Sequence, residues 1–445
     1  MFFMWTAVSS LTSENSLSSM RYLDSLRSLG MTIIAAAGIL LLAGCCDCVY
    51  TVEVSNPLDA DRHPEMVEVC YNQVADRLGI REGDSFIVKN RKGQEIPHQV
   101  TSDGKVIFQV QMKANGKETF RITKGQPAEY ENLMFGKQYQ NRLDDFVWEN
   151  DLVGFRAYGP ALQAKGERGF GYDIFTKRDT KKPVLEMFYE MALGEKTKSR
   201  HKELQAVDPQ KAKDYKIDSM TFHVDHGYGM DAYAVGPTFG AGVTALIDKD
   251  IIYPWCYKEY EILDNGPLRF SFKLTFNPIS VGSDENVIET RVITLDLGSH
   301  MNRTAVRYEN LNETKDIVAG IVLRDKDGNE VADIEKGYIA YPAPSMNFDN
   351  RNPDLDNGTH FMGHVYPETM RESKTVYHSE NEMKEERGGA PGHILAYSEY
   401  EPGEEFKYYW GFGWSHSEMK TYEQWISYLE TFSTMVRNPL IVTIK

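Results

Sequence analysis

The sequence has little cysteine and fewer basic than acidic residues. Five of its 445 residues are cysteines, and Cys45, Cys46 and Cys48 lie within four positions of one another. The other two, Cys70 and Cys256, provide neither a disulfide framework nor zinc-ligand spacing, so we expect two buried free thiols; a bridge between them is the alternative. A formal net charge of −16 argues against nucleic acid as a partner, because phosphate backbones bind basic surfaces.

Several catalytic signatures are also missing. The chain contains no GxSxG motif, no Walker loop and no GxGxxG that follows a strand, and it shows no repeat of 20–50 residues. The acidic turns at residues 325–330 and 350–358 lack the twelve-residue EF-hand pattern, so we interpret them as solvated turns. We therefore expect no cofactor and no bound metal.

The N-terminal segment resembles a processing signal. Residues 31–44 form an apolar run that is short for a membrane span but suits the core of a signal peptide, and two arginines precede it. The run ends in Leu-Ala-Gly-Cys, which resembles the bacterial lipobox, with Cys45 as the lipidated residue. We expect residues 1–48 to be removed or to carry the anchor. We also expect lipid alone to hold the protein at the cell envelope, on the periplasmic or outer-membrane face. An ordinary secretory signal or a membrane helix is the alternative.

The mature chain is predicted to be mainly β. Residues 49–125 contain short alternating strands separated by turns, which indicates a small β-sandwich. Residues 125–132 form a polar linker, and residues 133–445 contain longer strands that predict a large antiparallel two-sheet sandwich. Helices are expected only at 72–79, 184–194 and 421–436. The charged segments 196–216 and 379–392 are expected to be solvated loops.

Residues 221–242 concentrate the chemistry of the chain. His223, Asp225 and His226 can transfer protons near neutral pH, and glycines on both sides of Tyr228 permit a tight turn that would present them at a cleft. The prediction places IDSMTFHVDH on a strand that ends near this turn. A structural histidine beside a turn aspartate is the simpler interpretation, and a metal site built from the same three side chains is a weaker one.

A second candidate is GFRAYG, in which Arg156 and Tyr158 share one face of a strand. A guanidinium beside a phenol suits a sugar that carries a carboxylate, because Arg156 could bind the carboxylate and Tyr158 could pass a proton. A surface ion pair with a local carboxylate is the equally weighted alternative.

Aromatic runs supply candidate sugar platforms. In YYWGFGWSHS, most aromatic side chains are expected in the core, and Trp414 and His416 are the members expected at the surface. Trp255 lies in a similar run. We include Asp225 and Arg303 among the candidate substrate-binding residues.

Together, the lipobox, the small N-terminal sandwich, GFRAYGPA, HVDHGYGMDAYAVGPTFGAG and the WGFGWS run resemble the family of domain of unknown function 4861 over residues 50–445. The resemblance implies a supersandwich similar to that of galactose mutarotases, in secreted or lipid-anchored proteins of polysaccharide-degrading bacteria. It also implies an oligosaccharide dehydratase that leaves a 4,5-unsaturated uronic acid.

That chemistry requires a group that stabilises the enolate, a base and an acid. Arg156 is the candidate for the first role, His223 or His226 for the second, and Tyr158 or Tyr228 for the third. Two alternatives stay open. One is a hydrolase or epimerase that uses paired carboxylates such as Asp225 and Asp231, and the other is a noncatalytic glycan-binding protein.

Overall fold

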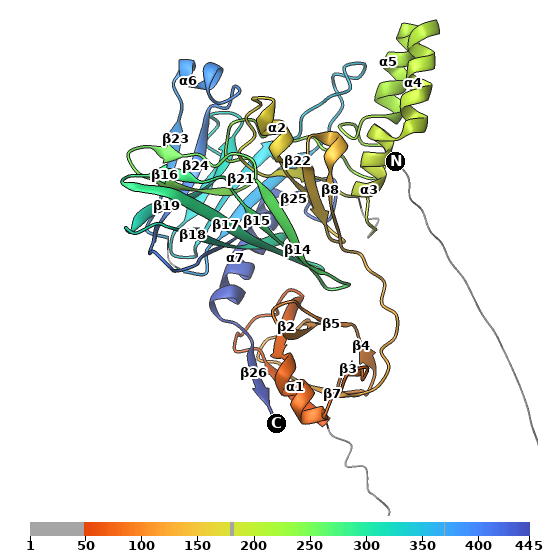
Figure 1. The fold of residues 1–445 in the computed structure, drawn as a ribbon, viewed down its shortest axis with the longest axis vertical. Coiled ribbons are helices and arrows are strands. Elements are labelled where there is room, and N and C mark those ends of the chain that lie inside the picture. The colour runs from red at the N-terminus through yellow and green to blue at the C-terminus, as the bar shows by residue number, and fades with distance from the viewer. Residues whose placement is uncertain (1–48, 179–181, 369) are drawn as a thin grey trace, which may run out of the picture. The chain divides into compact units, whose positions relative to one another are not determined.

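The computed structural model describes residues 49–178, 182–368 and 370–445 (Figure 1). The predicted signal segment, residues 1–48 with Cys45, lies outside the described residues. Every pair of neighbouring strands in the described sheets runs antiparallel. The prediction of a mainly β chain with large antiparallel sheets is confirmed.

The first part of the described chain forms two small sheets, with strand orders β26-β1-β7-β3-β4 and β2-β6-β5. Its elements are β1 (Val49–Ser55), β2 (Glu65–Cys70), α1 (Tyr71–Leu78), β3 (Phe86–Lys89), β4 (Glu95–Ile96), β5 (His98–Val100), β6 (Lys105–Val110) and β7 (Lys117–Lys124). Alternate residues of β1, namely Tyr50, Val52 and Val54, are buried in an apolar core that these sheets share. This alternation is the pattern of a strand with one face on the core. We call residues 49–124 together with β26 the small β-domain.

One strand of the small β-domain comes from the opposite end of the chain. β26 (Ile441–Ile444) pairs with β1, and Val52 lies opposite Ile444. The pattern of strands in the sequence predicts that all of residues 133–445 belong to the large domain and does not indicate this pairing. A four-residue strand contains no sequence signal for its partner, so its position is decided by packing between the chain ends.

The larger part contains three further sheets, with orders β13-β12-β19-β24-β23, β14-β15-β17-β18-β25-β22-β21-β20 with β16 beside β17, and β11-β10-β9-β8. Its first strands are β8 (Phe135–Tyr139), β9 (Asp145–Glu149), β10 (Gly154–Ala157), β11 (Asp173–Phe175), β12 (Val243–Ile247), β13 (Ile251–Ile252), β14 (Glu259–Asn265), β15 (Arg269–Thr275) and β16 (Ile279–Val281). The later ones are β17 (Asp284–Asp296), β18 (Met301–Glu309), β19 (Lys315–Leu323), β20 (Val331–Asp333), β21 (Tyr338–Pro344), β22 (Thr359–Val365), β23 (Glu372–Tyr377), β24 (Gly392–Tyr400) and β25 (Phe406–Trp414). All three sheets contribute side chains to one large apolar core.

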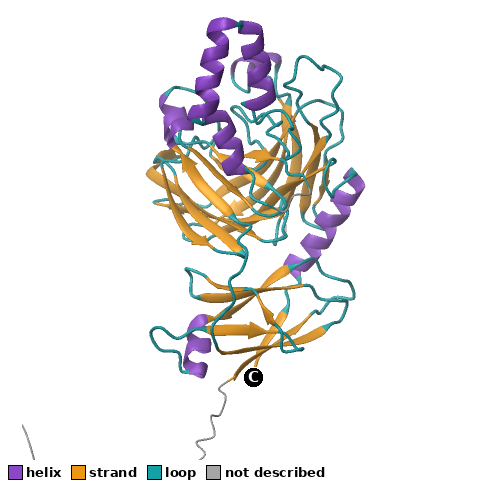
Figure 2. Cartoon of the chain, turned by 90° about the vertical axis from the view of Figure 1, so that its right-hand side faces the viewer, coloured by secondary structure: helices purple, strands orange, loops and turns teal. Residues whose placement is uncertain are grey.

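The helices lie outside these sheets (Figure 2). They are the 3₁₀ turn η1 (Gln140–Arg142), α2 (Pro160–Ala164), α3 (Leu185–Leu193), α4 (Glu195–Val207), α5 (Pro209–Ser219), α6 (Glu380–Glu385) and α7 (Tyr422–Arg437). The expected helices at 72–79, 184–194 and 421–436 are confirmed as α1, α3 and α7. Helix α7 begins with a capping box, in which the Thr421 and Gln424 side chains each bind the other residue's backbone amide.

The expectation of a loop at 196–216 was wrong, because this segment forms α4 and α5. Few side chains of either helix are buried, so neither shows the apolar stripe by which a helix is recognised in a sequence. The start of α5 is nevertheless encoded locally: Asp208 caps the helix by accepting from Lys211 N–H, and Pro209 follows it. The segment 379–392 likewise contains α6, which Ser379 caps.

The expectation of a strand over IDSMTFHVDH was also wrong. Residues 217–219 end α5, and residues 221–226 form turns.

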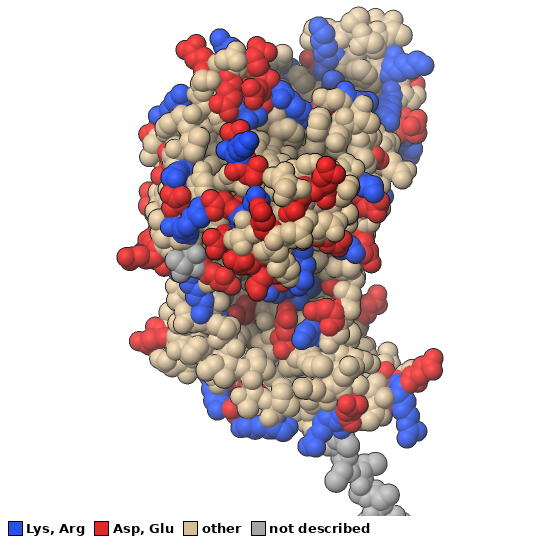
Figure 3. Space-filling model, turned by 60° about the vertical axis from the view of Figure 1, so that its left-hand side comes forward, with Lys and Arg blue, Asp and Glu red and all other residues tan. Residues whose placement is uncertain are grey.

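On the face that Figure 3 shows, Asp and Glu side chains are interspersed with Lys and Arg side chains.

Candidate functional site

A buried arginine among three carboxylates is the centre of the candidate site. Arg156 on β10 lies opposite Asp173 on β11, and its Nη2 donates to Asp173 Oδ2. The same nitrogen donates to Asp231 Oδ2 at 2.8 Å, and Nη1 lies 3.6 Å from Asp145 Oδ2. All four side chains are nearly inaccessible to solvent. The two candidates GFRAYG and residues 221–242, far apart in sequence, therefore meet through Arg156 and Asp231.

One cation cannot balance three buried carboxylates, and the pKa values reflect this. Burial raises the pKa of Asp145, and burial together with the charge of Asp173 raises the pKa of Asp231 to about 8. Asp231 therefore carries its proton at neutral pH. Asp173 accepts hydrogen bonds from Arg156, from the Tyr158 hydroxyl and from the Ile174 N–H.

Tyr158 connects this cluster to its surroundings. Its hydroxyl donates to Asp173 Oδ2 at 2.7 Å and lies 3.4 Å from Arg156 Nη2. Burial raises the pKa of Tyr158 well above its ordinary value, so the side chain is a neutral phenol. It can donate a proton only to a strongly basic group, such as the oxygen that departs in an elimination.

His223 lies at the accessible edge of the cluster. Its Nδ1 is 2.9 Å from the Asp231 carbonyl oxygen, which can only accept, so Nδ1 carries the proton. Asp231 Oδ2 lies 3.4 Å from the same nitrogen. No described residue hydrogen-bonds to Nε2, and 32% of the side chain is exposed.

The electrostatics of His223 suit a general base. Burial, with the nearby positive charge of Arg156, lowers the pKa of His223 below its ordinary value. The imidazole is therefore neutral at pH 7, with a free lone pair on an accessible nitrogen. We call His223, Asp231, Arg156, Asp173 and Tyr158 the His223 site.

The rest of the predicted cluster builds the turn. Asp225 accepts from Gly227 N–H and Gly229 N–H through Oδ1, and from Arg178 through Oδ2. His226 Nε2 lies 3.0 Å from the Thr221 carbonyl oxygen, so the two imidazoles bind different carbonyls. Asp225 and His226 thus stabilise the loop that positions His223, while Tyr228 is exposed above it.

Arg324, which follows the last residue of β19, is a further candidate that the motifs in the sequence did not indicate. Its Nη2 is buried without a hydrogen-bond partner among the described residues, and its guanidinium lies 5.4 Å from the ring centroid of Tyr233. Burial lowers the pKa of Arg324, and its charge interacts with Asp173 and Tyr158. The only sequence signal is an arginine at the end of the apolar run AGIVLR.

Other buried polar atoms of this region also make no hydrogen bond to the described residues. Among the described residues, the Tyr233 hydroxyl, Arg156 Nη1 and His360 Nδ1 make no hydrogen bond. Tyr233 interacts electrostatically with both Arg324 and Asp173, and its ring packs edge-on against His360. Buried polar groups are normally paired, so these atoms are suited to an oxygen-rich anionic ligand.

The expected exposure of Trp414 was wrong. Trp414 is buried, because β25 lies between β18 and β22, and its Nε1 donates to the Asn357 carbonyl. Its ring remains close to the site loop, since the Arg178 guanidinium lies 5.0 Å from its centroid. His416 lies beside it, with ring centroids 5.2 Å apart, and is partly exposed.

The remaining candidates lie elsewhere. Trp255 donates from Nε1 to the Glu167 carbonyl and lines a cavity of about 210 Å³ with Tyr253 and Phe276. Arg303 on β18 lines a separate pocket beside Glu68. Cys70 and Cys256 are both unpaired, as expected, although only Cys256 is fully buried.

No group of three His, Cys, Asp or Glu side chains that could hold a metal ion occurs among the described residues. The alternative metal site of His223, Asp225 and His226 therefore has no geometric support, because these side chains bind separate partners. No helix in the described ranges is long and apolar enough to span a bilayer.

Comparisons with known proteins give three results. A family model described as "Domain of unknown function (DUF4861)" matches residues 54–442. "Uncharacterized protein P7" of Formosa agariphila is 24% identical over 415 residues, which cover 88% of this chain and 93% of that protein.

Solved structures of a glycosyl hydrolase family 38 protein and of an alpha-mannosidase, both from Enterococcus faecalis, are also similar. Their TM-scores are 0.43 and 0.44, at 8% and 9% sequence identity, and each comparison covers 90% of this chain. It covers 48% and 46% of those chains, so this chain spans about half their length.

Proposed function

The chain belongs to the DUF4861 family, and from this premise we propose that it is a carbohydrate-active lyase that cleaves a C–O bond of uronic-acid oligosaccharides by β-elimination. The observation that carries the proposal is the state of His223. A neutral imidazole, with its proton held on Nδ1 by Asp231 and with Nε2 accessible, is suited to remove a proton from carbon.

The proton that His223 would remove lies on C5, next to the uronate carboxylate. Its removal places negative charge on that carboxylate, so a nearby cation lowers the barrier. We assign this role to Arg324, whose buried Nη2 has no protein partner among the described residues.

Arg156 takes a different role from the one expected from the sequence. Its Nη2 already donates to Asp173 and Asp231, and its side chain is buried behind them. We propose that Arg156 is a positioning residue, which holds the two aspartates and through them the His223 ring and the Tyr158 hydroxyl.

Tyr158 is the proposed acid. As the C4–O bond breaks, the departing oxygen takes the phenolic proton, and the C5 proton remains on His223 Nε2 until it passes to solvent. Asp173 aligns the Tyr158 hydroxyl through the 2.7 Å hydrogen bond. Tyr228, the other candidate acid, is 44% exposed and lies on the surface of the loop.

The two alternatives find less support in the geometry. A hydrolase needs two carboxyl groups that face one substrate, whereas Asp225 and Asp231 are engaged by different arginines, Arg178 and Arg156. A noncatalytic binding protein was expected to present Trp414 as its platform, and that ring is buried.

The decisive experiment records ultraviolet absorbance of a conjugated uronate while purified protein is mixed with a panel of uronic-acid oligosaccharides, with and without a chelator. We expect absorbance to rise with wild type and not with H223Q. Release of a saturated sugar without a rise in absorbance would favour hydrolysis, and no product from any member of the panel would refute the proposal.

We further propose that lipidation at Cys45 anchors the protein at the cell envelope, as the Leu-Ala-Gly-Cys sequence suggests. Metabolic labelling with a fatty acid should mark wild type and not C45S. Equal labelling of both proteins would refute the anchor.

A further inference from the structure

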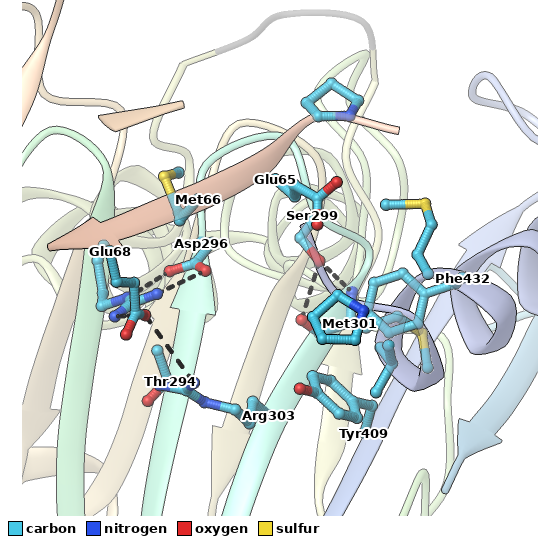
Figure 4. A pocket seen from close by; sticks show the side chains of 15 residues that line it. Glu65, Met66, Glu68, Thr294, Asp296, Ser299, Met301, Arg303, Tyr409 and Phe432 are labelled. Atoms are coloured by element: carbon cyan, nitrogen blue, oxygen red, sulfur yellow. Dashed lines mark hydrogen bonds and ion pairs between the residues drawn. The ribbon is translucent and has the colours of Figure 1, made fainter. Parts of the chain in front are cut away.

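A pocket of about 280 Å³ lies between the small β-domain and the nine-stranded sheet (Figure 4). Strand β2 provides one wall, strands β17, β18 and β25 provide the floor, and α7 provides the other wall. The volume is close to the lower end of small-ligand sites, ~300 Å³. None of its lining residues belongs to the His223 site.

A polar row crosses the floor of the pocket. Thr294, Arg303 and Tyr409 lie opposite one another on the adjacent strands β17, β18 and β25, so their side chains share one face of the sheet. Figure 4 shows the Arg303 side chain running toward Thr294 with its guanidinium below Glu68, and Tyr409 on the other side of Arg303.

Arg303 keeps hydrogen-bond donors available. Its side chain is 40% exposed, and its one ion pair among the described residues is a 4.0 Å contact from Nη1 to Glu68 Oε1. That carboxylate oxygen is already bound more closely by Arg269 Nη1, at 2.7 Å. The guanidinium of Arg303 is thus only partly neutralised.

Aromatic surface lies beside this cation. The rings of Tyr409 and Phe432 meet edge to face with centroids 5.3 Å apart, and Met66 and Met301 complete an apolar wall. A flat aromatic face next to a guanidinium matches a sugar ring that carries a carboxylate, since the ring packs on the aromatic face and the carboxylate pairs with arginine.

The walls of the pocket are held in place by hydrogen bonds on both sides. Gln99 Nε2 donates to the Arg269 carbonyl at 3.1 Å, and Gln109 Nε2 donates to the Leu297 carbonyl at 2.6 Å. On the side of α7, the buried Arg62 donates to the Met435 carbonyl at 3.1 Å. The pocket is therefore formed before any ligand binds, which lowers the entropic cost of binding.

We propose that this pocket is a second glycan site, which binds one uronate residue of an oligosaccharide through Arg303 and Tyr409. The choice of a uronate as ligand rests on the proposed function. The shape and charge of the pocket are independent of that function. Arg303 keeps the binding role expected from the sequence but exerts it away from the catalytic groups.

The test is calorimetric titration of a uronic-acid oligosaccharide into the H223Q protein, in which turnover is blocked. Two further variants, R303Q and R307Q, are made in that background. Arg307 is the matched control, because it lies on the same strand and face, is 58% exposed and pairs with Glu405 outside the pocket.

We expect two binding events in H223Q and in the R307Q variant, and one in the R303Q variant, with the lost event weakened at least ~10-fold. A neutral oligosaccharide of the same length should show no event that depends on Arg303. Equal titrations for R303Q and R307Q, or no binding by the parent, would overturn the second site. Absence of unsaturated product from wild type would refute the proposed function and leave this titration interpretable.

Discussion

At the scale of single residues, the proposed chemistry depends most on His223. We expect H223Q to lower the rate of unsaturated-product formation by ~10²–10⁴-fold, the usual contribution of a positioned base. H226Q is the matched control and should change the rate far less, because His226 binds the Thr221 carbonyl within its own loop. Equal losses in the two variants would assign both histidines to the loop rather than to the chemistry.

The pH dependence of the wild-type rate follows from the same residue. Since the pKa of His223 is lowered, the neutral base predominates at pH 6.5 and above. Protonation of His223 should therefore reduce the rate only below pH 6.5. This acid limb is absent if His223 is not the base.

Asp231 and Asp173 should respond differently to loss of charge. With a pKa of about 8, Asp231 is neutral at pH 7 in the folded protein but charged in the unfolded chain, so D231N should not lower the free energy of unfolding at pH 7. D173N removes the closest partner of the buried Arg156 and should lower the free energy of unfolding by ~3–5 kcal/mol. Denaturant unfolding at pH 7 measures both changes.

The sign of the pH effect provides a second readout for Asp231. The pKa of Asp231 is higher in the folded protein than in the unfolded chain, where it is ~3.9. The contribution of Asp231 to the free energy of unfolding is therefore complete below pH ~3.9 and is lost as the pH rises to about 8. Over this range D231N should gain stability relative to wild type. A difference that does not change with pH would contradict the raised pKa.

At the scale of elements, the loop of residues 221–242 contains five glycines with positive φ, of which Gly227 and Gly229 flank Tyr228 and differ in their surroundings. A Cβ on Gly229 would lie 1.9 Å from the Thr176 carbonyl oxygen, whereas a Cβ on Gly227 would meet nothing within 4 Å. We expect G229A to shift the loop and reduce the rate by ~100-fold, the effect of about 1 Å of misplacement. G227A carries the same backbone strain without the clash, and should retain most of the activity.

The C-terminal strand is also testable as an element. Leu440 and Val442 pack against the core of the small β-domain, and β26 covers the edge of β1. Deletion of residues 440–445 should lower the free energy of unfolding by about 2 kcal/mol or more, and should promote self-association through the exposed edge. Denaturation and size-exclusion chromatography measure these effects, and deletion of Lys445 alone is the control.

At the scale of the whole molecule, buried histidines link folding to pH. Burial lowers the pKa of His364 to about 4, so the folded protein keeps it neutral while the unfolded chain protonates it below pH ~6.5. Its contribution to stability is present above pH 6.5 and is lost as the pH falls toward 4. Between these values H364Q should reduce the slope of unfolding free energy against pH by about 1.4 kcal/mol per unit. Parallel slopes for wild type and variant would contradict this linkage.

The sequence by itself determined the class of the fold and much of the chemistry. Alternating apolar residues identify strands because one face of a strand is buried, and the apolar faces of α1, α3 and α7 identify those helices. The residue types of the candidate site, an arginine, a tyrosine and a histidine beside aspartates, could also be recognised from their local patterns. These features depend on residues close together in sequence.

Tertiary structure alone decided which of those residues act together. It joined Arg156 to Asp231, separated His223 from His226, buried Trp414 and placed the arginine after β19 near Asp173. It also paired the two ends of the chain and formed the pocket around Arg303. Contacts between distant segments depend on how the sheets pack on one another, and no local pattern of residues encodes that packing.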